Sequence, residues 1–487
     1  MKSFIFKYKY EIISFLITFA SVISIFFVSG LRFSNDDQFI LYRYIENISE
    51  GKGFVYNEGE KILGSTTPLF TLLAALLTYI SGFEAYTSVV LINIISISVS
   101  SIFFFKILER YTNGKFALFS VIVFAFNMSK IVSEGMESSL FILAVLGFLY
   151  FLISKKNYTA AVFLALSILT RPDAGIIAML ALIYWIKNEG FLRAIKFSIV
   201  TALAVLPWIL FSTYYFGSFI PQSLIAKLHT EDIVNQSDIQ ALKVQLSHLS
   251  RIYWGKFLDY ERIFLQVLFN LIPFLALFIL GLWQKLNKEN WIIFLIPVLY
   301  FISFSYSNPV MFPWYTTQIE PFWMLGSLLG LFFILEKINR PYFRVVILLF
   351  VIIGPTWFFA DLLTTEKQGS KMSLFDIGYF LKENVREGER VGVNNIGIIG
   401  YTSKAYIIDF FGLVNQDSYA FYPVIECADR NIQYIIPPNL IRHFEPEWLV
   451  LSGETELTPC FRNSKWFKDN YSLIYSKAGF VYRKIDA

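Results

Sequence analysis

Two adjacent carboxylates, Asp36 and Asp37, follow the first apolar stretch of this 487-residue chain. Carboxylates at a membrane boundary are costly unless they face water, a cation or a substrate. Because two like charges this close disfavour double ionisation, one of the pair could accept a proton as a general base. We expect the Asp36 side chain to face a wet cavity. The same residues could instead start a helix, since acids favour the first helical turn.

Further charged residues lie beside apolar stretches. Glu137 could act on a substrate or merely cap the apolar stretch that follows it. Arg171 precedes Pro172, which disfavours helical conformation at the arginine, so that its cation could point out of a helix break. Arg171 could also snorkel to the interface, and Lys227 could be an ordinary exposed loop lysine. Trp314 could belong to an interfacial aromatic belt, together with the residue that follows it.

The metal-binding and thiol residues leave several possibilities open. Two Cys and three scattered His make no zinc pattern. Asp36, Asp37 and Glu137 are the candidate ligands for a divalent cation, and no other cofactor is indicated. Cys427 and Cys460 could form a disulfide if their region lies outside the cytoplasm, or they could be two buried thiols.

The composition favours an integral membrane protein. Hydrophobic residues make up 56% of the chain and charged residues only 16%, whereas a soluble domain is roughly half apolar and a quarter charged. No basic tract interleaved with aromatic residues indicates nucleic-acid binding. Apolar stretches near the length of a bilayer span predict about eleven transmembrane helices. Their cores are 10–30, 86–105, 116–132, 138–153, 158–169, 173–187, 195–216, 263–284, 290–306, 318–335 and 343–361.

Charge placement predicts the orientation of these spans. Lys and Arg collect in cytoplasmic loops, and with the N-terminus inside they fall in the inner loops near 106–115, 155–156, 187–196, 285–288 and 337–344. The outer loops 133–137 and 307–317 contain none. This asymmetry favours two spans around Arg171. It places 31–85, 217–262 and 362–487 outside the cytoplasm. The first apolar stretch could be a signal peptide, but it is longer than a usual h-region and lacks a clear small-x-small cleavage site, so we interpret it as an uncleaved first span.

The outer segments should carry their own secondary structure. We expect an amphipathic helix over 36–50 and a helix lying in the membrane interface over 68–80. The sequence divides into a transmembrane module, 1–361, with the loop 31–85, and an α/β domain, 362–487. That domain should contain a helix over 373–387 and short strands at 390–393, 406–408, 434–436, 448–451, 473–475 and 480–482.

The first outer loop contains four motifs in a fixed order. They are Asp36-Asp37, Arg43-Tyr44, the turn Gly51-Lys52-Gly53-Phe54-Val55-Tyr56-Asn57-Glu58-Gly59-Glu60, and Gly64-Ser65-Thr66-Thr67-Pro68-Leu69. This order resembles the first extracytoplasmic loop of the GT-C glycosyltransferases, membrane enzymes that use polyprenyl-phosphate sugars. It is most similar to the branch that contains the bacterial cell-wall arabinofuranosyltransferases.

The resemblance covers nearly the whole chain. Matching segments are Gly135-Met136-Glu137-Ser138-Ser139-Leu140, Thr170-Arg171-Pro172-Asp173, Tyr215-Phe216-Gly217 with Pro221-Gln222-Ser223 and Ala226-Lys227, Trp314-Tyr315, Ile396-Gly397-Ile398-Ile399-Gly400-Tyr401 and Asp409-Phe410-Phe411-Gly412-Leu413. Ser138, Gln222 and Ser223 depart from the usual Thr, Asn and Thr. The departures at 222 and 223 put fine acceptor contacts there in doubt.

The resemblance implies an inverting glycosyltransferase on the outer face of the cytoplasmic membrane. The donor would be a polyprenyl-phosphate sugar, and the acceptor a glycan, a lipid or a protein. Asp36 is our expected base, with Asp37 and Glu137 as further catalytic candidates. The expected donor-phosphate and substrate-binding residues are Arg43, Tyr44, Asn47, Thr66, Arg171, Lys227, Trp314 and Tyr315.

Two other functions fit the same residues. Intramembrane acids and aromatic residues would also suit a transporter or flippase of polyprenyl-linked sugars, although such proteins more often show related halves. A non-catalytic receptor with a glycan-binding C-terminal domain is the third. Stabilisation of the departing phosphate is equally open, because Arg43, Arg171 and Lys227 could supply it, or a divalent cation could.

Overall fold

The computed structural model describes residues 8–29, 36–228, 238–250, 270–285, 289–307, 314–364, 369–422, 424, 426–427, 435–453, 456–477 and 479–485. The chain forms two compact units, each assembled from three segments. The first, here called the helical unit, consists of 1–32, 89–207 and 237–366. The second, here called the sheet unit, consists of 33–88, 208–236 and 367–487. The predicted division at 361/362 stays a prediction.

Long apolar helices account for most of the helical unit. Among the described residues, four helical segments are long and apolar enough to cross a membrane: Lys9–Phe27, Ala85–Tyr111, Gly114–Val132 and Phe191–Phe216. Shorter apolar helices cover 138–153, 157–170, 272–284, 291–306 and 341–353, and one more, 68–81, lies in the sheet unit. Where the structure describes them, the eleven predicted cores are helical except for the turn residues 290, 318 and 319. Their number as true spans remains a prediction.

The described helices have the following bounds: α2 Lys9–Ser29, α5 Ala85–Tyr111, α6 Gly114–Ser133, α7 Ser138–Ile153, α8 Asn157–Thr170, α9 Gly175–Glu189, α10 Phe191–Phe216, α13 Asp238–Ser250, α15 Ile272–Lys285, α16 Trp291–Ser307, α17 Trp314–Thr317, α18 Glu320–Lys337 and α19 Pro341–Thr364. The predicted helix break at Arg171 is confirmed, because α8 ends at Thr170 and Arg171 has an extended backbone. A short 3-10 turn, Pro172–Ala174, then leads into α9.

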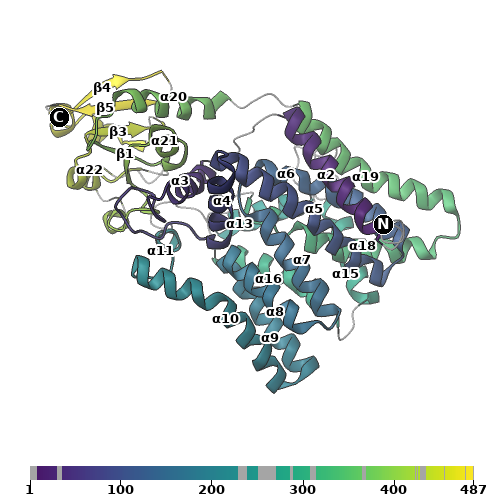
Figure 1. Cartoon of the computed structure of the whole chain (residues 1–487). Coiled ribbons are helices and arrows are strands. Elements are labelled where there is room, and N and C mark those ends of the chain that lie inside the picture. The colour runs from purple at the N-terminus through teal and green to yellow at the C-terminus, as the bar shows by residue number, and fades with distance from the viewer. Residues whose placement is uncertain are drawn as a thin grey trace. The chain divides into compact units, whose positions relative to one another are not determined.

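Close helix packing holds the helical unit together. Helix α2 packs along α6 and α19, and α7 pairs with α8 (Figure 1). Helices α15 and α18 approach most closely at three glycines. A side chain at Gly281 would overlap the carbonyl oxygen of Gly326, and one at Gly330 would overlap that of Leu277. Such contacts allow backbone-to-backbone packing between apolar helices.

The C-terminal residues of the sheet unit form the predicted α/β domain. Its five strands are β1 Arg390–Val393, β2 Tyr406–Asp409, β3 Trp448–Leu451, β4 Tyr471–Tyr475 and β5 Phe480–Lys484, in the order β2-β1-β3-β5-β4. Strand β1 runs parallel to β2 and β3, whereas β5 is antiparallel to β3 and β4. The parallel part places the loops after β1 and β2 at one edge of the sheet.

One predicted strand is wrong. Residue 434 lies outside the described residues, and Ile435 and Ile436 are not in a strand. Pro437 and Pro438 follow at once and begin helix α22, Pro438–Phe444. Because proline has no backbone N–H and a fixed φ, the pair stops strand pairing. A single backbone bond from Ile436 to the Glu456 carbonyl remains there, at 2.9 Å.

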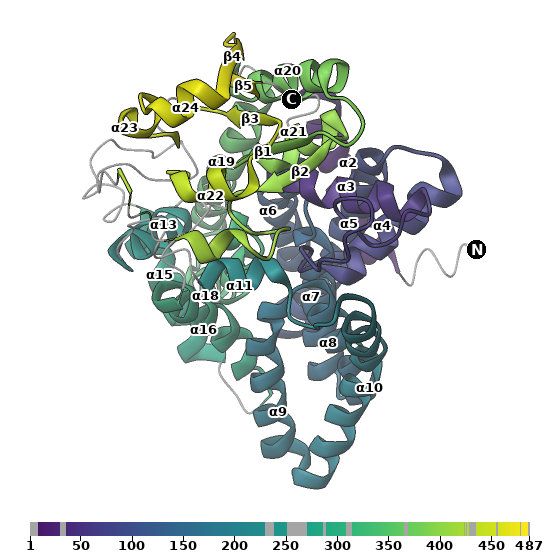
Figure 2. The ribbon, with the colours of Figure 1, turned by 90° about the vertical axis from the view of Figure 1, so that its left-hand side faces the viewer.

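Helices cover both faces of the sheet (Figures 1 and 2). On one face α20, Gly369–Asn384, and α21, Ile396–Ser403, bury side chains against β1, β2, β3 and β5. On the other face α22, α23 (Pro459–Arg462) and α24 (Lys465–Asn470) do the same. Cys427 and Cys460 form a disulfide with their Cα atoms 5.7 Å apart, so the alternative of two free thiols is wrong.

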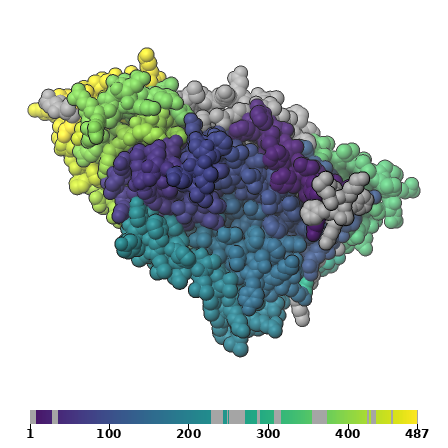
Figure 3. Space-filling view, in the orientation of Figure 1, coloured from purple at the N-terminus to yellow at the C-terminus, as the bar shows by residue number. Residues whose placement is uncertain are grey.

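Residues 36–81 complete the sheet unit. The predicted helices there are confirmed as α3, Asp37–Ser49, and α4, Pro68–Ser81. Aromatic residues Tyr44, Phe54 and Tyr56 join the same apolar cluster as the sheet face under α20. In the space-filling view the purple surface of this segment adjoins the green and yellow surface of the C-terminal residues (Figure 3). The first outer loop and the C-terminal domain thus share one core.

Helix α4 has an inverted amphipathic pattern. Its inner face holds Thr71, Ala74 and Thr78, while Leu76 and Tyr79 are exposed on the other side. Small and polar residues inside, with large apolar residues outside, suit a helix whose outer face contacts lipid. Its predicted place in the membrane interface stays a prediction.

Candidate functional site

The Asp36 carboxylate lies at the start of α3 and is held by the C-terminal domain. Its Oδ2 accepts a hydrogen bond from the backbone N–H of Gly397 at 2.9 Å, and its Oδ1 accepts one from Ile398 at 2.8 Å. These N–H groups belong to the first turn of α21, where helices favour an anion. Asp36 is half-buried, and the expectation that it faces a wet cavity stays a prediction. Its carboxylate is fixed by two backbone groups.

Glycine is required where α21 meets Asp36. A Cβ added to Gly397 would overlap the Asp36 carbonyl oxygen and would lie 2.6 Å from the carbonyl carbon and 2.9 Å from Cγ. Contacts below 3.0 Å to backbone atoms force something to move. The Gly397 motif position noted in the sequence is thus explained by close approach to Asp36.

The Arg43 side chain has a structural role that differs from the donor-phosphate role expected from the sequence. The side chain is buried, with 5% exposure, and stacks over the Tyr56 ring at 4.3 Å. Its guanidinium donates to the carbonyls of Tyr56 (2.8 Å), Gly400 (2.9 Å) and Ala405 (2.7 Å), and to Oδ1 of Asn57 at 3.3 Å. With its donors used in this way, Arg43 joins α3 to α21. We no longer assign it to the donor phosphate.

Tyr44 and Asn47, two further candidates, also hold the loop in shape. The Tyr44 hydroxyl donates to the Ile62 carbonyl at 2.9 Å and accepts from the Gly64 N–H at 3.0 Å. Asn47 Nδ2 donates to the carbonyls of Val55 and Tyr56. These bonds satisfy backbone groups that a loop would otherwise leave buried without partners. Both side chains therefore stabilise the conformation of the loop.

Thr66 sits in a hydroxyl-rich entry to α4. It is half-buried, and the neighbouring hydroxyls of Ser65, Thr67 and Thr71 lie within 3.1–3.4 Å of one another. The substrate role of Thr66 stays a proposal.

The first outer loop is tied to the sheet edge by side chains. Asn57 Oδ1 accepts from the Ile407 N–H at 3.0 Å, and its Nδ2 donates to the Ile407 carbonyl at 2.8 Å. The amide therefore pairs with edge strand β2 as another strand would. Nearby, Glu46 accepts hydrogen bonds from Tyr401 of α21 and from Lys404, the residue after this helix. These contacts join the loop motif to the C-terminal motifs.

Asp409 ends strand β2 as a fully buried carboxylate. It accepts from the N–H groups of Phe411 and Val414 at 2.9 Å each. Burial raises its pKa to about 6, although these backbone bonds act in the opposite direction. The group shapes the turn of the Asp409-Phe410-Phe411-Gly412-Leu413 motif, whose Gly412 has a φ of 77°.

A second charged cluster lies in the helical unit, at the predicted outer ends of α6 to α9. Arg171, with 9% exposure, pairs with Glu137, with 2% exposure. It also holds Asp173 bidentately, through Nε at 3.0 Å and Nη2 at 3.1 Å. The sequence analysis named both Glu137 and Arg171 as candidate site residues. It did not list Asp173 as a site residue.

Other polar residues complete this cluster. The Tyr300 hydroxyl donates to the Asp173 carbonyl at 2.8 Å, and Gln318 Nε2 approaches Asp173 Oδ2 at 3.4 Å. Lys130 pairs with Glu320, which is 2% exposed. Ion pairs this deeply buried are costly and mark functional positions in membrane proteins.

Glu134 is a carboxylate of this cluster whose pKa is shifted toward neutral pH. Burial raises its pKa to about 8, although Lys130 and a hydrogen bond from Thr317 at 3.2 Å oppose the shift. Sequence reasoning missed Lys130 and Glu134. Lys130 lies in the last turn of α6, Glu134 caps that helix and Glu137 precedes α7, so no single helical spacing links the three residues.

The remaining candidates are placed only in part. Lys227 lies in α11, Gln222–Leu228, of the sheet unit, and Trp314 begins α17; of their side chains the structure describes nothing. Tyr315 is half-buried and stacks on Phe304 with ring centroids 6.1 Å apart.

The candidate metal ligands do not converge. Within the described ranges, no three His, Cys, Asp or Glu side chains come together in a way that could hold a metal ion. Glu137 is paired with Arg171 and Asp36 with α21. We therefore route no step through a metal.

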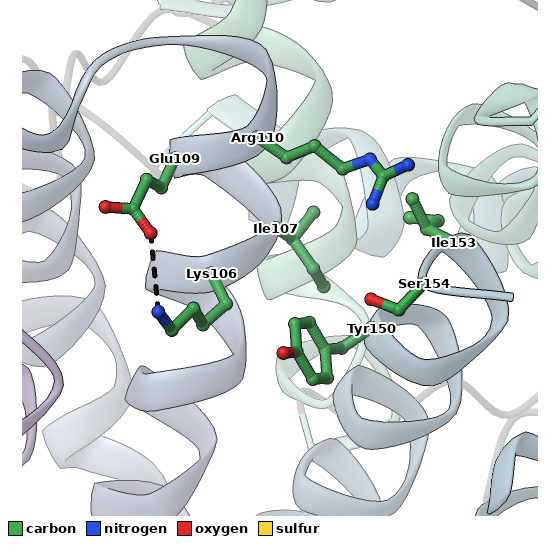
Figure 4. Close-up of a pocket in the computed structure, with 7 residues that line it drawn as sticks. All are labelled: Lys106, Ile107, Glu109, Arg110, Tyr150, Ile153 and Ser154. Atoms are coloured by element: carbon green, nitrogen blue, oxygen red, sulfur yellow. Dashed lines mark ion pairs between the residues drawn. The ribbon is translucent and has the colours of Figure 1, made fainter. Parts of the chain in front are cut away.

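A pocket at the other end of the helical unit holds none of these candidates (Figure 4). It lies between the last turns of α5 and α7 and is lined by Lys106, Ile107, Glu109, Arg110, Tyr150, Ile153 and Ser154. Lys106 pairs with Glu109 and Arg110 with Glu289. These are the loops predicted to face the cytoplasm, and the pocket's cations are already matched by acids.

Comparison with solved structures finds the same fold in proteins of low sequence identity. One similar structure is ArnT from Cupriavidus metallidurans bound to undecaprenyl phosphate, 13% identical with a TM-score of 0.62, covering 97% of this chain and 98% of that one. Another is the apo oligosaccharyltransferase of Archaeoglobus fulgidus, 12% identical with a TM-score of 0.60, covering 98% of this chain and 74% of that one.

Sequence comparison adds less. A family model described as a domain of unknown function (DUF8728) matches residues 361–484, which contain the C-terminal α/β domain. No curated protein sequence matches the chain. The arabinofuranosyltransferase branch that the motifs resemble therefore stays a prediction.

Proposed function

We propose that the protein is an inverting glycosyltransferase that moves a sugar from a polyprenyl-phosphate donor to a hydroxyl group of a glycan, lipid or protein acceptor. The observation that carries this proposal is the end-to-end fold likeness to ArnT, whose solved structure is bound to undecaprenyl phosphate. A fold hosts many functions. The acidic motif at the start of α3 adds the chemical support that the fold alone lacks.

The reaction needs a base but no strong acid. The acceptor oxygen attacks the anomeric carbon, the bond from that carbon to the phosphate oxygen breaks, and the electron pair leaves with polyprenyl phosphate. The acceptor proton passes to a carboxylate. Because the phosphate leaves already charged, protonation is not required, and a single displacement inverts the anomeric carbon.

Asp36 is the base in this proposal, with Asp37 as its neighbour. Two backbone N–H bonds favour the charged carboxylate and fix its orientation. A carboxylate oxygen offers more than one lone-pair site, so two backbone hydrogen bonds do not by themselves prevent Asp36 from accepting a proton. The orientation of the carboxylate matters as well as its basicity, since a base acts only within hydrogen-bond reach of its proton.

Stabilisation of the departing phosphate falls to Arg171 and Lys227 in this proposal. Arg171 is positioned by Glu137 and Asp173, which together hold its guanidinium plane. A planar guanidinium binds phosphate through two parallel bonds. Because both carboxylates compete for it, Arg171 would have to share its remaining N–H groups with the ligand.

We further propose that the N-terminus faces the cytoplasm and the C-terminal domain lies outside it. The Cys427–Cys460 disulfide supports this orientation, because disulfides persist in oxidising compartments. A reporter active only in the cytoplasm, fused after Ala487, should be silent. Activity of that fusion would overturn the orientation.

The direct test is transfer by the purified protein. Incubation with candidate polyprenyl-phosphate sugars and an acceptor extract should release polyprenyl phosphate and yield a glycosylated product. A transporter or flippase, in proteoliposomes, would instead move the intact lipid-linked sugar between leaflets with no release. Movement without release would replace the enzyme by the transporter.

A further inference from the structure

We infer that the C-terminal α/β domain is a positioning element for the base, acting through the backbone N–H groups of Gly397 and Ile398. This inference rests on the proposed function, in which Asp36 accepts the acceptor's proton. It assigns the C-terminal domain a part in the reaction itself, where an accessory glycan-binding module would have none. Gly397 and Ile398 are positioning residues, because they act through Asp36.

The first support is that α21 meets Asp36 with the groups best suited to orient an anion. The two N–H groups bind different carboxylate oxygens, at 2.9 Å and 2.8 Å, which fixes the plane of the carboxylate as well as its place. Bonds of this kind are charge-assisted and about twice as strong as neutral ones. Gly397 brings the helix this close because it has no side chain to collide with Asp36.

The second support is that the first outer loop also grips the rest of α21. Tyr56 donates its hydroxyl proton to the Ile396 carbonyl at 2.6 Å, beside the turn that binds Asp36. At the other end, Arg43 donates to the carbonyls of Gly400 and Ala405. Anion at the N-terminus and cation at the C-terminus is the arrangement that a helix dipole favours. The eight-residue helix is held at both ends by side chains of the same loop.

The third support is that α21 is anchored to the sheet. Ile396 and Ile399 are buried with Val391 of β1 and Ile407 of β2 in one apolar cluster. On its other side α21 contacts α20, where a Cβ on Gly378 would lie 2.8 Å from Thr402. The sheet therefore fixes the helix, and the helix fixes the carboxylate. A shift of the domain must move Asp36.

The experiment is a double-mutant cycle between Gly397→Ala and Asp36→Ala. A misplacement near 1 Å costs about 10²-fold in turnover, so Gly397→Ala should lower kcat by that factor with the KM for the donor unchanged. In the Asp36→Ala background the same change should cause no further loss, because the group it acts through is gone. Gly114→Ala is the matched control, since its Cβ meets its nearest neighbours at an ordinary 3.7 Å.

A milder variant covers the case in which Gly397→Ala does not fold. Tyr56→Phe removes only the hydroxyl that holds Ile396 and should lower kcat about tenfold, the equivalent of one lost hydrogen bond. Its control is Tyr406→Phe, which removes a hydroxyl that bridges the same loop to β2 through Glu60 but does not contact α21. That control should keep the wild-type kcat.

The outcomes separate the inference from the function beneath it. If the wild-type protein transfers sugar while Gly397→Ala and Tyr56→Phe match it, the positioning role is refuted and the glycosyltransferase stands. If Gly397→Ala lowers kcat equally with and without Asp36, the helix acts on stability alone and the inference fails. If the wild-type protein transfers no sugar from any donor, the proposed function falls and the inference with it.

Discussion

Replacement of Arg43 by lysine separates a structural role from a donor-binding role. The guanidinium donates to four acceptors, of which three are the main-chain carbonyls of Tyr56, Gly400 and Ala405. A lysine ammonium is a single point and cannot reach the positions of Nε and both Nη atoms. If two of the bonds are lost, at about 1.5–3 kcal/mol for each charged bond, unfolding becomes easier by roughly 3–6 kcal/mol.

That loss is comparable to the whole stability of a typical domain, about 5–15 kcal/mol. In detergent, Arg43→Lys should lower the unfolding midpoint and speed amide hydrogen exchange over residues 396–409, where α21 and β2 lie. Arg386→Lys, at an exposed arginine of the same unit, should change neither. Unchanged exchange together with a raised KM for the donor would refute this reasoning and return Arg43 to the phosphate.

Three further predictions address the site. Asp36→Asn should lower turnover by about 10²–10⁴-fold. It should also loosen α21, because the asparagine NH2 group would face a backbone N–H donor. Near-normal turnover of this variant together with an inactive Asp37→Asn would make Asp37 the base. Arg171→Lys should weaken donor use in plots of initial rate against donor concentration, and superimposable curves would mean a purely structural arginine. Because burial raises the pKa of Asp409 from 3.8 to about 6, stability should fall by roughly 3 kcal/mol as pH rises from about 4 through 6; Asp409→Asn should flatten that dependence, and an equal slope in both proteins would count against it.

Local patterns predicted most of the elements. Apolar run length located the helices, and the Arg171-Pro172 pair located the break between α8 and α9, because proline restricts the residue before it. Alternating helix and strand signals found the C-terminal domain. The failure at 434–436 came from reading apolar residues without the two prolines that follow them.

The roles of the loop residues could not be predicted in the same way. Arg43 and Asp36 find their partners in α21, some 360 residues away in sequence, and no spacing rule links the two segments. A buried arginine that binds main-chain carbonyls carries the same sequence signal as one that awaits a phosphate. Lys130 and Glu134 could not be found from helical spacing either, since α6 ends at Ser133 and Glu137 precedes the next helix.

The side-chain contacts that hold both ends of α21 also set an order of events during synthesis. Arg43 and its acceptor Gly400 are separated by 357 residues. At about 5–20 residues per second, the helix emerges roughly 20–70 s after the loop that grips it. Arg43 and Tyr56 are synthesised long before the Gly400 and Ile396 carbonyls that they bind. A chain cut short before residue 390 would therefore carry all the apolar helices and still lack a finished first loop, which makes truncated products early substrates for membrane quality-control proteases.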